Sequence, residues 1–173
     1  MAIRLVAGLG NPGAPYAGTR HNVGYRVVDL LKEAPPAGVR LFKPASFMNT
    51  SGVPIGELAR RNGIAPAELL VVCDDFSLPL GRLRIRREGS AGGHHGLESI
   101  LEVFATRQVP RLRVGIGPVP EGKDPADFVL ENFKSPERKS IETMIEAAAQ
   151  AVRLAAAEGL EKAMNRFNPE PKS

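Results

Sequence analysis

Strand signals and helix signals alternate along the chain, and this alternation limits the possible folds more than any other feature of the sequence. Amphipathic helical patterns separate the strands, and no linker or internal repeat divides the chain. We therefore expect a single α/β domain over residues 1–173, with a three-layer α/β/α arrangement and a mixed, mostly parallel twisted sheet flanked by helices. Apolar runs that suit strands lie at 3–7, 39–43, 69–73, 82–87 and 112–116.

Proline, glycine and apolar periodicity predict how the second half of the chain is arranged. Residues 117–127 are rich in proline, glycine and charge, which predicts an exposed loop. A long apolar stripe then predicts a C-terminal helix over about 136–158, closed by Gly159 and followed by a short tail. Apolar residues make up 43% of the chain, which is enough for the core of one domain.

Composition excludes several classes of protein. No apolar segment approaches the ~20 residues that a membrane-spanning helix needs, and Arg4 interrupts the first apolar run, unlike a signal peptide. The single cysteine cannot form an intramolecular disulfide, and Cys73 closes an apolar run, so we expect a buried thiol and a cytoplasmic protein. The three histidines and the cysteine lack the spacing of zinc ligands, so we expect no metal site.

The loop after the first strand reads Gly8-Leu9-Gly10-Asn11-Pro12-Gly13, and its glycines match the dinucleotide fingerprint G-x-G-x-x-G. That fingerprint needs a helix that begins inside the motif, because the helix N-terminus binds the pyrophosphate. Pro12 and Pro15 disfavour a helix through 11–16. A nucleotide-binding oxidoreductase is therefore a disfavoured alternative, and we expect no cofactor.

Polar side chains collect near the ends of the predicted strands. In an open α/β sheet such positions face the crevice where ligands bind, so loops on one edge would build one site. A histidine held by a carboxylate can act as a general base toward water, and nearby amides can stabilise an oxyanion. No serine lies in a G-x-S-x-G turn, so a serine nucleophile lacks support. The polar groups are Asn11, His21, Asn49, Asp74 and the pair His94-His95.

Arginines alternate with apolar residues at Arg82, Arg84 and Arg86, so three guanidinium groups share one strand face about 6.6 Å apart from one to the next. This spacing is close to the phosphate repeat of a nucleic-acid backbone, and the net charge of +4 fits a polyanionic partner. The solvent-facing side of a half-buried strand is the ordinary alternative. Arg111 and Arg113, ahead of the next glycine turn, favour nucleic-acid binding.

In their order and content these motifs resemble the bacterial peptidyl-tRNA hydrolases, from Ile3 to about Arg166. The resemblance implies hydrolysis of the ester between a peptide and the terminal ribose of tRNA, which releases free tRNA from stalled synthesis. It also implies a cytoplasmic monomer that uses no metal and no cofactor. The motifs that carry it are Gly8 to Gly13 with Tyr16, Thr19-Arg20-His21-Asn22, Phe47-Met48-Asn49 with Ser51-Gly52, Asp74 with Leu78-Pro79 and Gly81, Gly92-Gly93-His94 with Gly96-Leu97, and Leu112-Arg113 with Gly115-Ile116-Gly117.

Carried over residue by residue, the resemblance implies a role for each matching side chain. His21 would be the base that activates water, and Asp74 would orient its imidazole. Asn22 and His94 would hold these two residues in position without contacting the substrate. Arg86 and Arg113 would contact the 5′-phosphate region of the tRNA.

The substrate-binding side of the site follows from the same resemblance. Asn11 and Asn49 would hold the substrate and stabilise the oxyanion. Met48 would line the peptide side, and Tyr16 belongs to the family signature. His95 stands where the family usually has an asparagine that contacts substrate or a bound water.

Two further points bear on the resemblance. The connection over 34–46 is shorter than the family commonly has, so we expect a trimmed sheet edge with every motif residue kept. The main alternative function is a non-catalytic RNA-binding relative, such as the plant organelle splicing factors built on this fold. The joint presence of Asn11, His21, Asn49 and Asp74 favours the enzyme, because a pure binder has no need of the base.

Overall fold

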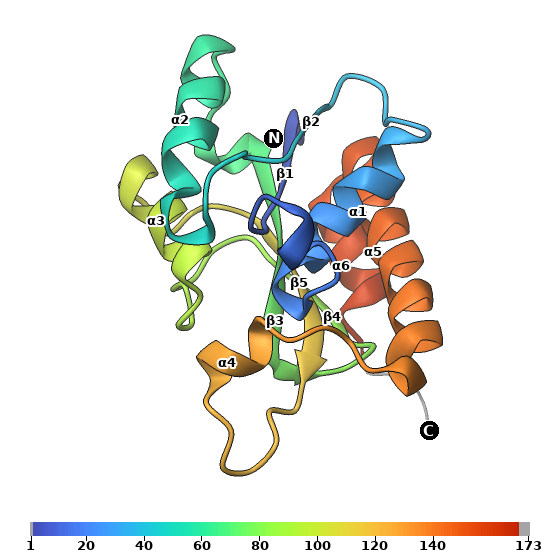
Figure 1. The fold of residues 1–173 in the computed structure, drawn as a ribbon. Helices are drawn as coiled ribbons and strands as arrows, with labels where there is room; N and C mark the ends of the chain where they lie inside the picture. The colour runs from blue at the N-terminus through green and yellow to red at the C-terminus, as the bar shows by residue number, and fades with distance from the viewer. Residues whose placement is uncertain (1, 170–173) are drawn as a thin grey trace.

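The computed structural model describes residues 2–169, and a five-stranded sheet forms its centre (Figure 1). The strand order is β2-β1-β3-β5-β4, and only β4 runs antiparallel to its neighbour. This is the mixed, mostly parallel sheet that the sequence predicts. The strands are β1 (Leu5–Gly8), β2 (Arg40–Phe42), β3 (Leu69–Pro79), β4 (Leu83–Arg86) and β5 (Arg111–Gly117).

Helices cover both faces of the sheet, which gives the predicted three-layer arrangement (Figure 1). One face carries α1 (Val23–Lys32), α5 (Arg138–Glu158) and α6 (Leu160–Phe167). The other face carries α2 (Gly52–Arg61) and α3 (His95–Phe104). A short helix, α4 (Pro125–Val129), lies beyond the carboxyl ends of β3 and β5.

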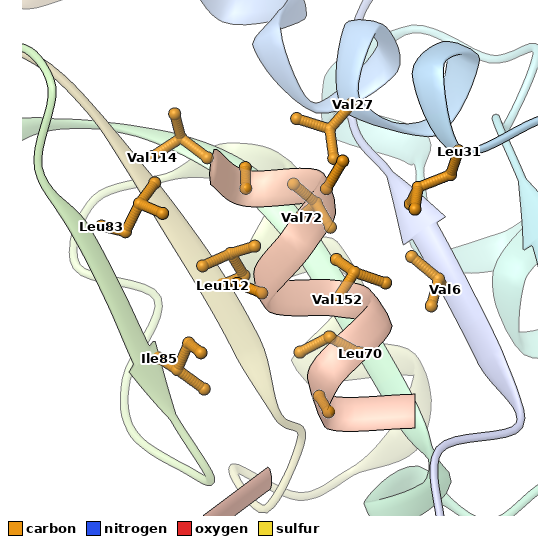
Figure 2. Close-up of a cluster of buried hydrophobic side chains, with 14 of the residues drawn as sticks. Val6, Val27, Leu31, Leu70, Val72, Leu83, Ile85, Leu112, Val114 and Val152 are labelled. Carbon is orange, nitrogen blue, oxygen red and sulfur yellow. The ribbon is translucent and has the colours of Figure 1, made fainter. Parts of the chain in front are cut away.

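Both faces of the central strands are apolar because side chains alternate across a strand and helices cover each side. Val6, Leu70 and Val72 turn toward α1 and α5, where Figure 2 shows them near Val27 and Val152. The alternate residues turn toward α2 and α3, and they include Leu5, Ala7, Val71 and Cys73. Burial raises the pKa of the Cys73 thiol, as expected for an unreactive buried cysteine.

The chain reverses its path across the sheet between β1 and β3, and this reversal locates a crevice. β2 lies beside β1 on one side in the sheet, and the chain reaches it through α1. β3 lies beside β1 on the other side, and the chain reaches it from β2 through α2. Loops that diverge from two adjacent parallel strands leave a crevice beyond their carboxyl ends. Asn11 follows β1 and Asp74 lies in β3, so both residues border this crevice.

The loop after β1 does not form the helix of a dinucleotide site. It makes a 3-10 turn at Ala14–Tyr16, and the first α-helix begins only at Val23. A Cβ at Gly24 would lie 2.3 Å from the carbonyl oxygen of Val72, so glycine allows α1 to pack directly on the sheet. The short connection over 34–46 supplies β2, a three-residue strand at the sheet edge.

Two boundaries differ from the sequence expectations. β3 continues through Asp74 and Asp75 to Pro79, with an irregularity after Asp75, because its backbone keeps pairing with β5 beyond the apolar run. The expected exposed loop over 117–127 includes the start of α4, whose N-terminus is capped by the Asp124 side chain accepting from Ala126 N at 2.9 Å.

The expected short tail after Gly159 is wrong in its first part, because residues 160–167 form α6. Just after this helix, Asn168 pairs with the backbone of Ile85, accepting from its N–H at 2.7 Å and donating to its carbonyl at 3.0 Å. The amide therefore covers part of the edge strand β4, which would otherwise be an open pairing site. Residues 170–173 of the tail lie outside the described residues. Within residues 2–169, no helix has both the length and the apolar character required to cross a membrane.

Candidate active site

A 3-10 turn, η2 (Arg20–Asn22), presents His21 at the crevice immediately before α1. The Nδ1 atom of His21 lies 2.8 Å from Oδ2 of Asp74. The His21 side chain is 12% exposed and the Asp74 side chain 2% exposed, so the contact is shielded from water while the imidazole can still be reached. The structure thus brings together two residues that are far apart in the sequence.

His94 approaches the same carboxylate from the other side. Its Nε2 lies 2.8 Å from Oδ1 of Asp74, while its Nδ1 accepts the backbone N–H of Leu97 at 3.2 Å and caps α3. A neutral ring that accepts at Nδ1 carries its proton on Nε2, so His94 donates to Asp74. An ionised carboxylate only accepts, so His21 donates to it from Nδ1. The free lone pair of His21 is then on Nε2.

The charge on Asp74 depends on these two imidazoles. Burial alone raises the pKa of the Asp74 carboxyl, but His21 and then His94 outweigh burial by charge and hydrogen bonding. The pKa of Asp74 therefore lies well below its usual value. An ionised carboxylate at this position can stabilise a positive charge that develops on His21 during a reaction.

The three side chains also have the donor types of a metal site, and their ligand atoms lie within 4.8 Å of one another. Local spacing cannot indicate this group, because positions 21, 74 and 94 meet only in the fold. A metal on Nε2 of His94 would require the proton of that neutral ring on Nδ1, where the Leu97 N–H already donates. The donor pattern therefore fits a hydrogen-bonded network better than a metal centre.

Asn11 is held in one orientation beside this network. Its Oδ1 accepts the backbone N–H of Met48 at 2.7 Å, and the residue is 7% exposed. The side chain of Asn22 brackets the Asn11 backbone, accepting from its N–H at 2.8 Å and donating to its carbonyl at 2.9 Å. With the oxygen occupied, the amide NH₂ group of Asn11 remains available as a donor to a ligand.

The remaining predicted substrate contacts lie around Asn11. Met48 is buried, and a Cβ at Gly96 would lie 2.4 Å from its sulfur, so glycine allows α3 to approach Met48. The ring of Tyr16 meets the exposed ring of Phe47 edge to face at 6.1 Å. Asn49 is exposed, and its side chain has no hydrogen bond to another described residue. His95, the first residue of α3, is also exposed, whereas its neighbour His94 turns inward.

The arginines of β4 and β5 divide into two kinds. Arg84 and Arg86 alternate with the buried Leu83 and Ile85, so they share the opposite sheet face, and Arg82 lies just before the strand. Arg111 was expected to favour nucleic-acid binding, but this is wrong because the side chain is buried. Its guanidinium donates to the carbonyls of Val109, Ser90 and Arg107.

Arg113 is half-buried and already has an internal partner. Its Nη2 lies 2.6 Å from Oδ2 of Asp75, a contact that the sequence patterns do not indicate. Because neighbours on a strand point to opposite faces, β3 directs Asp74 to the histidines and Asp75 to Arg113. An anion bound at Arg113 must therefore share this guanidinium with Asp75.

Comparison with known proteins gives one consistent result. A family model described as peptidyl-tRNA hydrolase matches residues 5–173. The chain is 44% identical over 187 residues to a peptidyl-tRNA hydrolase of Elusimicrobium minutum, covering 96% of this chain and 99% of that protein. It is 44% identical over 184 residues to one of Mycobacterium tuberculosis, covering 95% and 96%. The crystal structure of peptidyl-tRNA hydrolase from Acinetobacter baumannii superposes with a TM-score of 0.89 at 31% identity, covering 96% of this chain and 94% of that one.

Proposed function

The chain belongs to the peptidyl-tRNA hydrolase family and hydrolyses peptidyl-tRNA with release of free tRNA, and we propose that His21 is the base that activates the attacking water. The observation that carries this proposal is the contact of His21 Nδ1 with the buried carboxylate of Asp74 at 2.8 Å. It leaves Nε2 as the nitrogen of the ring that has no hydrogen-bond partner among the described residues, on a side chain that is 12% exposed.

The reaction then needs only the side chains of this crevice. Nε2 of His21 takes a proton from water, and the resulting hydroxide adds to the carbonyl carbon of the ester. Asp74 stabilises the imidazolium that forms. The tetrahedral intermediate collapses, its bond to the ribose oxygen breaks, and that oxygen takes the proton from Nε2. The products are the free peptide and the tRNA with its terminal hydroxyl restored.

Asn11 supports the oxyanion in this scheme. Its Oδ1 is occupied by Met48 N, so its NH₂ group is left to donate to the developing charge in this scheme. Asn49 follows Met48 in the same 3-10 turn, and its exposed amide contributes the second donor once substrate binds. Met48 and Tyr16 border the peptide side.

A hydrolysis assay separates this function from RNA binding without catalysis. Purified protein is incubated with N-acylaminoacyl-tRNA, and release of the N-acyl amino acid is measured together with tRNA binding. Free N-acyl amino-acid esters serve as the control for the contribution of the tRNA body. Binding without release would favour the RNA-binding alternative.

We also propose that Arg86 and Arg113 bind tRNA phosphate and take no part in bond breaking. Replacing both with alanine should raise KM with little change in kcat, because the lost contacts are the same in the ground state and the transition state. The salt dependence of tRNA binding should become shallower by about two counterions. Alanine at both Lys139 and Arg153, two cations of α5 on the opposite face of the sheet, supplies a charge-matched control. Equal salt slopes for the variant and the parent would contradict the assignment.

His95 is proposed to replace the family asparagine as a neutral hydrogen-bonding group. Both side chains donate and accept, but only imidazole can take up a proton, after which it no longer accepts. His95→Asn should keep near-parental activity at neutral and alkaline pH and exceed the parent at acid pH. His95→Ala should lose more, because both hydrogen-bonding functions vanish. The measurement is a pH–rate profile of the parent and both variants. If His95→Asn is inactive at every pH, His95 has a catalytic role.

We also propose that residues 1–173 form one hydrolase domain that acts as a cytoplasmic monomer. The free, buried Cys73 suits a reducing compartment. All side chains in the proposed reaction come from this one chain. Sedimentation of the protein at assay concentration tests the monomer.

A further inference from the structure

Arg20, the residue before His21, is a charged side chain in the interior. It is 2% exposed, as deeply buried as the aliphatic core. Taking a guanidinium out of water is strongly unfavourable unless its donors are satisfied. Because this buried charge adjoins the candidate base in the sequence, its contacts bear on where that base is held.

All the polar contacts of the Arg20 side chain come from one segment, residues 128–137. Nη1 donates to the carbonyl of Phe128 at 3.0 Å and to Glu131 Oε1 at 3.2 Å, and Nη2 donates to Glu137 Oε1 at 3.4 Å. The guanidinium also lies over the Phe128 ring, 4.1 Å from its centroid. Within the part of the chain that is described, Nε has no hydrogen-bond partner.

The backbone at Thr19 and Arg20 is bound to the same segment as the Arg20 side chain. The N–H of Arg20 donates to the carbonyl of Glu131 at 3.0 Å, and Thr19 forms an isolated antiparallel bridge with Asn132. On its opposite side, η2 is bound through Asn22 to the loop after β1. The turn that carries His21 is thus held from two directions, and Arg20 supplies the side-chain part of one of them.

We infer that Arg20 is a positioning residue, whose guanidinium fastens η2 to residues 128–137 and thereby keeps Nδ1 of His21 on Asp74. The inference rests on the proposed role of His21 as the base. A 3-10 turn of three residues has poor hydrogen-bond geometry of its own, so outside contacts must hold its orientation. Misplacing a catalytic group by 1 Å can cost about 10²-fold in rate.

The competing explanation is that Arg20 only stabilises the fold. The two explanations differ in what happens to the histidine. The titratable groups that face His21 are Asp74 on β3 and His94 before α3. If η2 loosens, the imidazolium loses part of its contact with Asp74, so the acid limb of activity moves to lower pH. A purely structural residue lowers the melting temperature and leaves this limb unchanged.

The test compares Arg20→Met and Arg20→Lys with the parent. Arg111→Met is the matched control, because Arg111 is equally buried and its guanidinium donates to the carbonyls of Val109, Ser90 and Arg107, none of which belongs to η2 or to residues 128–137. Measurements are kcat per folded active site, KM, the pH–rate profile, the melting temperature and the proton resonance of His21 Nδ1–H. For Arg20→Met we expect kcat to fall about 10- to 100-fold with KM nearly unchanged. The acid limb of the pH–rate profile should move to lower pH, and the Nδ1–H signal should broaden. Arg20→Lys should give values between those of Arg20→Met and the parent.

Other outcomes overturn the inference. An unchanged acid limb and kcat with a lower melting temperature would make Arg20 structural only. If Arg20→Met fails to fold, Glu137→Gln removes one charged partner at a half-buried position and should show the same changes at smaller size. No shift in that variant would also contradict the inference. If His21→Ala retains full activity, it is the proposed function that fails, whatever the Arg20 variants do.

Discussion

His21→Ala is expected to lower kcat for peptidyl-tRNA hydrolysis by at least about 10²–10⁴-fold, the usual contribution of a general base. Binding of tRNA should persist, because Arg86 and Arg113, which we propose bind phosphate, lie on β4 and β5 and not on η2. The substitution should therefore act on kcat and leave the dissociation constant for deacylated tRNA near the parental value.

Within residues 2–169, neither of the other two histidines is placed to replace His21 as the base. The ring of His94 lies 5.0 Å away, but both its nitrogens are engaged, one by Asp74 and one by Leu97 N. His95 is exposed on α3 and outside this network. A residual rate above about a tenth of the parent would therefore mean that water is activated by another group.

The measurement is single-turnover release of the N-acyl amino acid from N-acylaminoacyl-tRNA, with tRNA binding followed at the same salt concentration. Free imidazole is the control, because it can enter the space that the substitution leaves and supply a base that is not attached to the protein. Partial recovery with added imidazole is expected for His21→Ala and not for the parent. Lack of recovery together with weak tRNA binding would indicate a disturbed fold.

Much of the fold could be predicted from local patterns. The apolar run 69–73 could be identified as a strand buried on both faces, because parallel sheets covered by helices produce continuous apolar runs. Its continuation to Pro79 could not, since pairing with β5 and not apolarity maintains it. The helix α6 was missed for a similar reason: Gly159 ends the long apolar stripe, and the sequence does not indicate that Asn168 will pair with β4.

The sequence could suggest which polar groups gather near the strand ends, but not which of them are in contact. The rule for strand ends groups them, the resemblance implies roles that stay predictions, and only the fold brings His21 and His94 onto Asp74. Local spacing could not tell Arg111 from Arg113, since both precede one glycine turn, yet one binds buried carbonyls and the other Asp75. The contacts of Arg20 also join positions more than a hundred residues apart, and no periodicity indicates them.

The second large effect is expected for Asp74→Asn. Judged from sequence alone, this change keeps the shape and removes only a charge. The contacts of His94 make the expected loss larger. Because Leu97 N donates to Nδ1 of His94, the Nε2–H of that ring must donate to residue 74. The introduced amide then turns its oxygen to His94 and its NH₂ group to His21.

An NH₂ group facing Nδ1 of His21 forces that nitrogen to accept, so the proton moves to Nε2 and the base is lost. The same tautomer error in the Ser-His-Asp triad of serine proteases costs about 10⁴-fold in kcat, and we expect a loss of that order here. The measurement is kcat under saturating N-acylaminoacyl-tRNA. A loss below about tenfold would contradict the assigned tautomers.

The lowered pKa of Asp74 makes a separate prediction about stability. A carboxyl whose pKa falls on folding stabilises the protein above its unfolded pKa of about 3.9, and this contribution is lost as the pH falls toward the folded value. The asparagine variant lacks the contribution at every pH. Its melting temperature should therefore decline less than that of the parent between neutral pH and about pH 3. Parallel declines would show that the carboxylate gains nothing from the histidines.

A double variant distinguishes the tautomer from the charge as the cause of the loss in Asp74→Asn. His94→Phe keeps a ring beside His21 but removes the N–H that holds the amide oxygen. In Asp74→Asn with His94→Phe the amide is free to turn its oxygen to His21, whose Nδ1–H can donate again and whose Nε2 regains its lone pair. The double variant should thus be more active than Asp74→Asn alone, although it lacks one more native contact. If it is equally inactive or worse, the missing negative charge and not the misplaced proton accounts for the loss.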